Sequence, residues 1–266
     1  MHVTLFVTCV VDLFQPEVGV AAVRVLRAGG CEVSCPLGQT CCGQPAWNSG
    51  HAAEAAKVAR TTLAALESDG GDVVVVPAGS CATMIRVFWP ELFEVVGDHD
   101  AAARARQLGQ RTKELSELLV TLDLPELHLS SPERVAYHHS CHMLRELDLE
   151  GPPVALLEQV EGCQQVAWTA DQRCCGFGGL FSFKLPETSV AMADDKLASL
   201  AEAGADDVVG CDTSCLLHLR GRAEHEGRAL RTRHLVEVLA AALPGAVPDT
   251  DTGSNADAAS SRDEGA

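Results

Sequence analysis

The cysteines of this chain repeat in a fixed order, and this repeat constrains the fold more than any other feature. Eight of the twelve cysteines form two matching sets: Cys9, Cys41, Cys42 and Cys81, then Cys141, Cys174, Cys175 and Cys215. The first cysteines of the two sets are 132 residues apart, both members of the adjacent pairs are 133 apart, and the last cysteines are 134 apart. Adjacent cysteine pairs in such register indicate an internal duplication. Each half is therefore expected to be the same structural unit.

Strand and helix patterns alternate around these anchors. The first half is expected to form strands at 3–7, 32–34 and 73–76 and helices at 17–26 and 51–66. The second half is expected to form strands at 134–138, 164–168 and 207–209 and helices at 153–160 and 187–203. Such alternation is typical of parallel sheets with right-handed crossovers. The fold class is therefore α/β, with two homologous Rossmann-like domains, each a small, mostly parallel sheet with helices on both faces.

The domain boundaries follow from the same pattern. The first domain is expected at 1–97 and the second at 131–244, joined by a connecting segment at 98–130 whose central helix spans 101–122. Residues 245–266 are rich in Pro, Gly, Ser, Asp and Ala. Because such a composition cannot offset the entropy of ordering, a disordered acidic tail is expected there.

Charge and hydropathy exclude several classes of partner. The chain has 20 Lys and Arg against 37 Asp and Glu, a net charge of −17 without any basic run, so nucleic acid and anionic membranes are poor partners. No stretch reaches the roughly 18 apolar residues of a membrane span, and no basic segment precedes the first apolar run. A cytoplasmic location is expected. In that reducing compartment, twelve cysteines indicate metal or redox chemistry rather than a disulfide framework.

The expected strands place the eight repeated cysteines at one edge of each sheet. Ligands of open α/β sheets gather at the carboxyl ends of the strands, where these cysteines lie. Cys31 and Cys163 also correspond across the repeat but fall at the opposite strand ends, while Cys35 and Cys211 have no counterpart. These four are expected to be small buried side chains.

The spacing of the repeated cysteines favours iron–sulfur clusters over the alternatives. Structural zinc is commonly held by two short C-x2-C pairs, which neither half contains. A disulfide between immediate neighbours would be strained, whereas Gly43 and Gly176 allow the turn that lets both thiolates face one ligand. Four thiolates per half suit one cluster per half. A zinc-stabilised module and a thiol-exchange protein remain the alternatives of another class.

Four segments carry a family resemblance: Cys41 to Pro45 (CCGQP), Gly79 to Cys81 (GSC), Tyr137 to His142 (YHHSCH) and Cys174 to Gly179 (CCGFGG). They resemble the CCG-domain (cysteine-rich domain) iron–sulfur oxidoreductases, and most closely the branch that serves lactate utilization, over most of residues 3–244. The resemblance implies two CCG domains and an iron–sulfur electron-transfer subunit of a cytoplasmic system that oxidises L-lactate, a 2-hydroxy acid, to pyruvate. It also implies companion subunits, including a ferredoxin-type iron–sulfur protein. Heterodisulfide-reductase-like subunits and the iron–sulfur subunits of glycolate and glycerol-3-phosphate dehydrogenases share the same plan and are the alternatives.

One departure from the family pattern bears on the type of cluster. The fullest motif ends each half in C-x-x-C, and its fifth cysteine helps to hold a non-cubane cluster. Here Met84 and His218 replace that last cysteine. Two four-thiolate [4Fe–4S] clusters are therefore the simpler expectation, with Met84 in the core and His218 more often a packing residue than a ligand.

Three histidines surround Cys141, and one of them is a candidate catalytic residue. A titratable base would assist proton-coupled removal of two electrons from a substrate, and His142 is the best placed; His138 and His139 are expected to pack around the loop. Asp194-Asp195-Lys196 is expected on the solvated face of its helix. No flavin, nicotinamide or nucleotide motif and no ferredoxin-type cysteine run is present. Any electron relay therefore needs a partner subunit.

Overall fold

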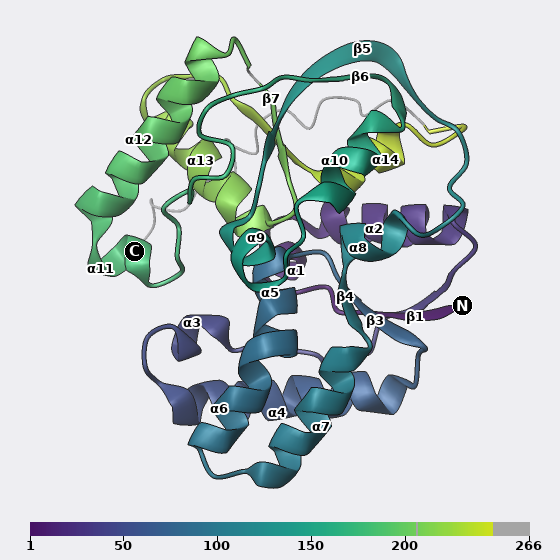
Figure 1. Cartoon of the computed structure of the whole chain (residues 1–266), viewed down its shortest axis with the longest axis vertical. Coiled ribbons are helices and arrows are strands. Elements are labelled where there is room, and N and C mark those ends of the chain that lie inside the picture. Colours follow the sequence, from purple (N-terminus) through teal and green to yellow (C-terminus); the bar gives the residue numbers. More distant parts are fainter. Residues whose placement is uncertain (206, 247–266) are drawn as a thin grey trace, which may run out of the picture.

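The computed structural model describes residues 1–205 and 207–246, so the tail predicted from residue 245 lies outside the described residues from 247 onward. Two four-stranded parallel sheets form the framework (Figure 1). The first has the order β2-β1-β3-β4, from strands β1 (His2–Leu5), β2 (Glu32–Ser34), β3 (Val73–Val76) and β4 (Thr112–Glu114). The second has the order β6-β5-β7-β8, from strands β5 (Leu127–His138), β6 (Val160–Gln165), β7 (Asp207–Gly210) and β8 (Arg231–His234). The same strand order in both halves confirms the predicted pair of Rossmann-like α/β units.

The helices follow the strands in equivalent places. The first half contains α1 (Cys9–Phe14), α2 (Pro16–Ala28), α3 (Gln44–Trp47), α4 (Ala52–Asp69), α5 (Gly79–Thr83), a π-helical turn at Met84–Phe88, α6 (Trp89–Val95), α7 (His99–Gln110) and α8 (Leu115–Leu119). The second half contains α9 (Cys141–Glu146), α10 (Gly151–Glu158), α11 (Phe181–Lys184), α12 (Pro186–Glu202), α13 (Thr213–His225) and α14 (Leu235–Ala241). The central strand β3 is a run of four buried valines, as expected for a parallel strand covered on both faces.

The segment between the halves differs from the prediction. The single helix expected over 101–122 is wrong: α7 ends at Gln110, and β4 and α8 follow it. β4 pairs with β3 as a fourth strand, and its sequence Thr-Lys-Glu carries no apolar run to reveal a strand. β8, with the sequence Arg-Thr-Arg-His, was not predicted for the same reason. The strand expected at 164–168 instead spans Val160–Gln165, and the preceding helix, expected at 153–160, lies two residues earlier at Gly151–Glu158.

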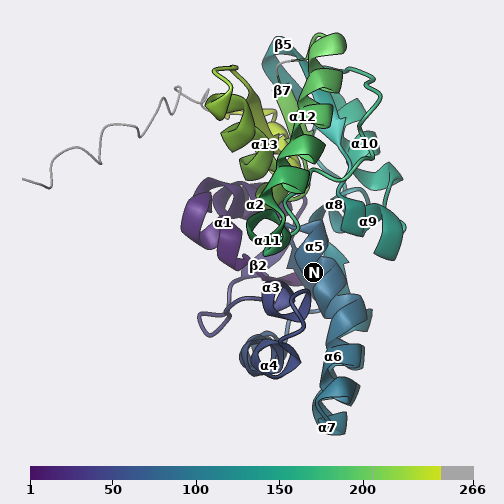
Figure 2. The same ribbon diagram turned by 90° about the vertical axis from the view of Figure 1, so that its left-hand side faces the viewer.

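The two halves share a core and face each other at the carboxyl ends of their strands. Helices α2 and α14 pack together between the sheets, and buried side chains from both halves, such as Leu5 and Tyr137, form one core (Figures 1 and 2). The contacts at the strand ends are reciprocal, because α5 packs on α9 while α1 packs on α13. Gly79 N donates to Cys211 O at 3.2 Å across the junction. Segments that follow strands in one half therefore contact segments that follow strands in the other.

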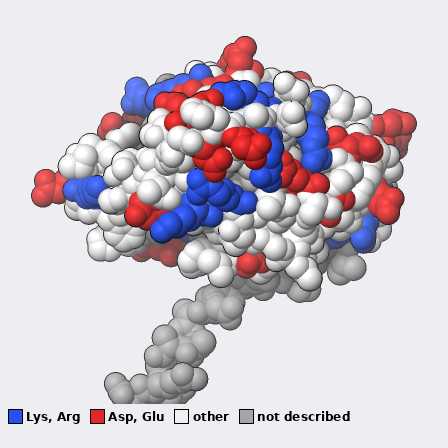
Figure 3. Space-filling model, turned by 90° about the horizontal axis from the view of Figure 1, so that it is seen from below, with Lys and Arg blue, Asp and Glu red and all other residues white. Residues whose placement is uncertain are grey.

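Charged side chains of both signs share the visible surface. Seen from below, side chains of both signs are interspersed and form no extended basic patch on that face (Figure 3). Among residues 1–205 and 207–246, no helix is long and apolar enough to span a bilayer.

Candidate metal centres

The first thiol group consists of Cys9, Cys41, Cys42 and Cys81, which come from three different elements. Cys9 begins α1, the adjacent pair lies in the loop between β2 and α3, and Cys81 lies in α5. Sγ of Cys42 lies 3.3 Å from Sγ of Cys81. Thiol hydrogen bonds also connect Cys9 with Cys41 and Cys41 with Cys42. The fold thus brings together all four cysteines predicted for this half.

The second thiol group repeats the arrangement with Cys141, Cys174, Cys175 and Cys215. Cys141 begins α9, the pair lies in the loop before α11, and Cys215 lies in the first turn of α13. Thiol hydrogen bonds connect Cys141 with Cys174, Cys174 with Cys175, and Cys175 with Cys215. All eight sequence-predicted cysteines therefore lie in two groups of four, and none of the chain's twelve cysteines is in a disulfide.

A glycine after each cysteine pair makes the turn possible. Gly43 has φ 87° and Gly176 has φ 92°, in the region that favours glycine. Space is also short, because a Cβ on Gly43 would lie 2.9 Å from Ala55 O and one on Gly176 would lie 2.5 Å from Ser189 O. The glycines therefore let each loop pack against α4 or α12 while both thiols of the pair turn inward.

The thiol groups already favour a thiolate at one position each. The pKa of Cys41 is lowered because Cys42 and Cys9 donate to it, and that of Cys174 is lowered because Cys141 and Cys175 do. Backbone N–H groups add to this, since Gly43 N lies 3.4 Å from Sγ of Cys41 and Gly176 N lies 3.5 Å from Sγ of Cys174. Such donors stabilise thiolates, which are the metal-binding form of cysteine.

The donor chemistry fits iron–sulfur clusters. Each group offers four sulfur atoms and no carboxylate, and thiolates are the usual ligands of such clusters. A ring nitrogen of His138 also lies within 4.8 Å of Sγ of Cys175 and Cys215, and these three donors could hold a metal ion. Nε2 of His138 is buried and makes no hydrogen bond with the described residues. Sequence reasoning overlooked His138 as a possible ligand. Its position as the last residue of the central strand β5, next to the thiol loops, could have indicated this role.

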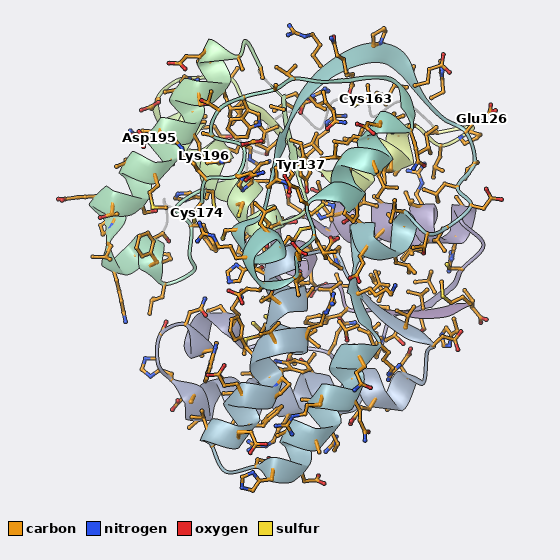
Figure 4. The ribbon with its side chains drawn as sticks, viewed as in Figure 1. Glu126, Tyr137, Cys163, Cys174, Asp195 and Lys196 are labelled. Atoms are coloured by element: carbon orange, nitrogen blue, oxygen red, sulfur yellow. The ribbon has the colours of Figure 1, made fainter. Side chains whose placement is uncertain are left out.

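Lys196 contradicts the sequence-based expectation for its helix. It was expected on a solvated face, yet it is completely buried, whereas its neighbour Asp195 is exposed. Figure 4 shows Lys196 on the inner side of α12, toward Cys174. Burial lowers its pKa to about 8, while the neighbouring Cys175 and Cys215 act in the opposite direction. The periodicity could have revealed this burial, because Lys196 continues the stripe of Ala193, Leu197 and Leu200.

The candidate catalytic residue His142 lies at the junction of the halves. Its Nδ1 is 3.7 Å from Sγ of Cys141, and its Nε2 is 3.3 Å from Nε2 of Gln44, which directly follows the first CCG sequence. Gln44 Nε2 also donates to Ser80 O at 3.0 Å. His142 therefore links the two cysteine-bearing regions, and its catalytic role stays a prediction.

Met84, His218 and the four cysteines outside the two thiol groups were expected to be packing residues, and most of them are. Met84 is in the core, as expected, and His218 lies with Nε2 3.3 Å from Oγ of Ser189. Cys31 and Cys211 are buried and Cys163 is half-buried; Figure 4 shows Cys163 far from Cys174. Cys35 is exposed, so its expected burial is wrong. The short strand β2 ends at Ser34 and leaves the next side chain outside the sheet.

Comparisons with known proteins agree with this geometry. The model of the cysteine-rich domain family, CCG, matches residues 3–86 and 135–220. Lactate utilization protein A of Geobacillus kaustophilus is 43% identical over 240 residues, covering 90% of this chain and 98% of that protein. Lactate utilization protein A of Bacillus velezensis is 42% identical over 240 residues, with 90% and 99% covered.

A solved structure shares the fold at low sequence identity. The crystal structure of a hypothetical protein from Helicobacter pylori matches with a TM-score of 0.65 and 11% identity, over 91% of this chain and 49% of that chain. The likeness concerns the fold alone. With both halves matched by the family model and relatives above 40% identity over nearly its whole length, the chain belongs to the CCG cysteine-rich domain family.

Proposed function

We propose that this chain is the iron–sulfur electron-transfer subunit of a system that oxidises L-lactate to pyruvate. The observation that carries the proposal is the convergence of eight thiols into two groups of four at the facing strand ends. The substrate is inferred from relatives named lactate utilization protein A. Twelve free thiols further support a location in the reducing cytoplasm.

Each thiol group would hold one [4Fe–4S] cluster, which supplies a one-electron carrier when bound. The chain's own residues prepare the site. Backbone N–H groups of Gly43, Gly176 and Phe177 point at cysteine sulfurs and stabilise the thiolate form. Cys42, Cys81, Cys175 and Cys215 are buried, which limits the access of water to the ligands. His142, between the halves, is positioned to hold a proton beside Cys141.

Anaerobic reconstitution tests the cofactor. Two four-cysteine sites predict about eight iron and eight sulfide per chain, with the brown colour of a cluster protein. Iron, acid-labile sulfide and zinc would be quantified on the same samples. Stoichiometric zinc without iron uptake would refute the iron–sulfur assignment and favour the alternative of a zinc-stabilised binding module.

The structure favours four ligands per cluster over five. Met84 stands where a fifth cysteine would end the first motif, and it is fully buried in the core formed with Ala82 and Trp89. His218 stands at the equivalent place in the second half and is engaged with Ser189. This supports cubane [4Fe–4S] clusters and counts against the alternative of a heterodisulfide-reductase-like subunit that uses a five-cysteine site.

Lactate oxidation by this chain is expected to need companion subunits, including a ferredoxin-type iron–sulfur protein. Removal of two electrons from a 2-hydroxy acid normally involves an organic carrier, and this sequence has no motif for binding one. The purified chain alone should therefore form pyruvate at a negligible rate with an artificial acceptor, and adding the companions should restore turnover. Rapid turnover by the chain alone would show that it is the catalytic component itself.

A further inference from the structure

The internal repeat allows each residue around one thiol group to be compared with its counterpart around the other. Ala55 O faces Gly43 in the first half, and Ser189 O faces Gly176 in the second, so α4 and α12 correspond at an interval of 134 residues. That alignment pairs the buried Leu63 with the buried Leu197. It also pairs Thr62 with Lys196.

Thr62 and Lys196 perform the same structural task with different chemistry. Thr62 Oγ1 donates to Cys41 O at 3.2 Å and accepts from Thr40 N at 3.0 Å, which fixes the loop that enters the first cysteine pair. Lys196 Nζ donates to the carbonyl oxygens of Ala170 and Arg173, the latter at 2.7 Å, which fixes the loop that enters the second pair. A neutral hydroxyl would suffice for this task. The second half instead uses an ammonium group.

That ammonium group lacks a carboxylate partner. No Asp or Glu oxygen of the described chain lies within 4.0 Å of Lys196 Nζ, which sits 4.5 Å from the centre of the Trp168 ring. A buried charge is costly unless an opposite charge compensates it. Besides Asp171, the groups whose negative charge would favour the ammonium form are the sulfurs of Cys175, Cys215 and Cys174.

Other polar groups distinguish the second thiol group from the first. His138 is the counterpart of Phe6. Thr4 of β1 pairs with β3 as Ala136 of β5 pairs with β7, and each of the two residues lies two positions further along its chain. The negative charge of Asp212 raises the pKa of Cys141 and of Cys215, whereas the positive charge of Lys196 lowers the pKa of Cys215. Its carboxylate already accepts hydrogen bonds from Ser80 N at 2.9 Å and Ser214 Oγ at 2.5 Å. The carboxylate of Asp212 is thus engaged elsewhere, so the sulfurs of the second thiol group, with Asp171, are left to compensate the charge of Lys196.

We propose that Lys196 is the buried counter-charge of a cluster held by the second thiol group, and that the two clusters consequently differ in reduction potential although their four cysteine ligands correspond. The inference rests on the proposed function. Reduction adds one negative charge to a cluster, and a nearby ammonium group stabilises that added charge. Lys196 thus raises the potential of the second cluster, while Thr62 leaves the first without this contribution.

The test compares Lys196→Thr, which copies the first half, with Lys196→Arg, which keeps the charge and the donors. Each is reconstituted in the full chain, and the clusters are titrated with a reductant while electron paramagnetic resonance follows them. Cys42→Ser, which leaves only the second group intact, assigns the signals. Thr62→Val is the matched control, because it removes the loop-fixing hydroxyl without changing a charge.

Lys196→Thr should lower the reduction equilibrium constant of the second cluster at least tenfold, about 59 mV for one electron, and leave the first unchanged. Lys196→Arg should restore the wild-type value, and Thr62→Val should shift neither cluster comparably. If the wild type binds no iron, both this inference and the proposed function fail. If it binds two clusters and Lys196→Thr shifts neither potential, or both equally, only this inference fails. Loss of second-group iron in both Lys196 variants would likewise overturn it, because Lys196 would then be needed for the shape of the site and not for its charge.

Discussion

Gly176→Ala provides a severe test of the geometry around the second cysteine pair. At φ 92°, a residue with a side chain is strained by about 1–2 kcal/mol relative to a relaxed backbone. The added Cβ would lie 2.5 Å from Ser189 O and 3.0 Å from Cβ of Met192, and such overpacking costs about 1–3 kcal/mol. Loss of glycine flexibility in the unfolded chain offsets about 0.4–1 kcal/mol. The expected net loss is therefore about 1–5 kcal/mol, with about 3 kcal/mol near the middle of the range.

Urea unfolding of the metal-free chain measures this loss. With a slope of about 3 kcal/mol/M, a loss of about 3 kcal/mol lowers the midpoint by about 1 M. Gly227→Ala is the matched control, because Gly227 has φ 69° but nothing within 4 Å of an added Cβ. It retains only the backbone strain less the same offset and should cost at most about 2 kcal/mol. Equal effects of the two substitutions would refute the argument that close packing of the loop against α12 requires glycine.

Two further predictions concern iron content and pH. Cys42→Ser and Cys175→Ser should each lose about half of the reconstituted iron, whereas Cys31→Ser and Cys163→Ser should retain all of it; equal losses from Cys163→Ser and Cys175→Ser would contradict the ligand assignment. Burial raises the pKa of Glu114 from 4.5 to about 7, so the folded chain loses stability as pH rises through that interval. Because Glu114→Gln cannot ionise, its free energy of unfolding in urea, relative to that of the wild type, should increase by up to about 3 kcal/mol between pH 4 and pH 8. A difference that does not change with pH would contradict the reasoning.

Sequence patterns predicted the parts of the fold that depend on local apolar runs. Val73 to Val76 forms the predicted central strand, and Glu32–Ser34 forms a strand with the predicted bounds. The edge strands β4 and β8 were missed because their pairing is decided by the neighbouring strand rather than by their own polar sequences. Their stability comes from long-range hydrogen bonding, which leaves no trace in local composition.

The candidate site was predictable to the extent that it depends on the repeat. Spacing alone predicted which four cysteines gather in each half, and the fold brings them together. The cysteine spacing carries no information on Lys196: the apolar stripe of its helix indicates burial, but the carbonyl groups that accept from it come from a distant loop. The position of His142 against Gln44 also depends on how the halves meet, which no single repeat encodes.

The contacts across the junction have a consequence for biosynthesis. Gly79 N and Ser80 N, at the start of the helix that carries Cys81, bond to Cys211 O and to the carboxylate of Asp212. When the ribosome has released only the first half, those acceptors have not yet been made. The first site therefore cannot acquire its final surroundings during translation of its own half. Cofactor insertion at both sites should accordingly follow release of the whole chain, and an assembly factor would meet a finished two-lobed protein rather than a nascent half.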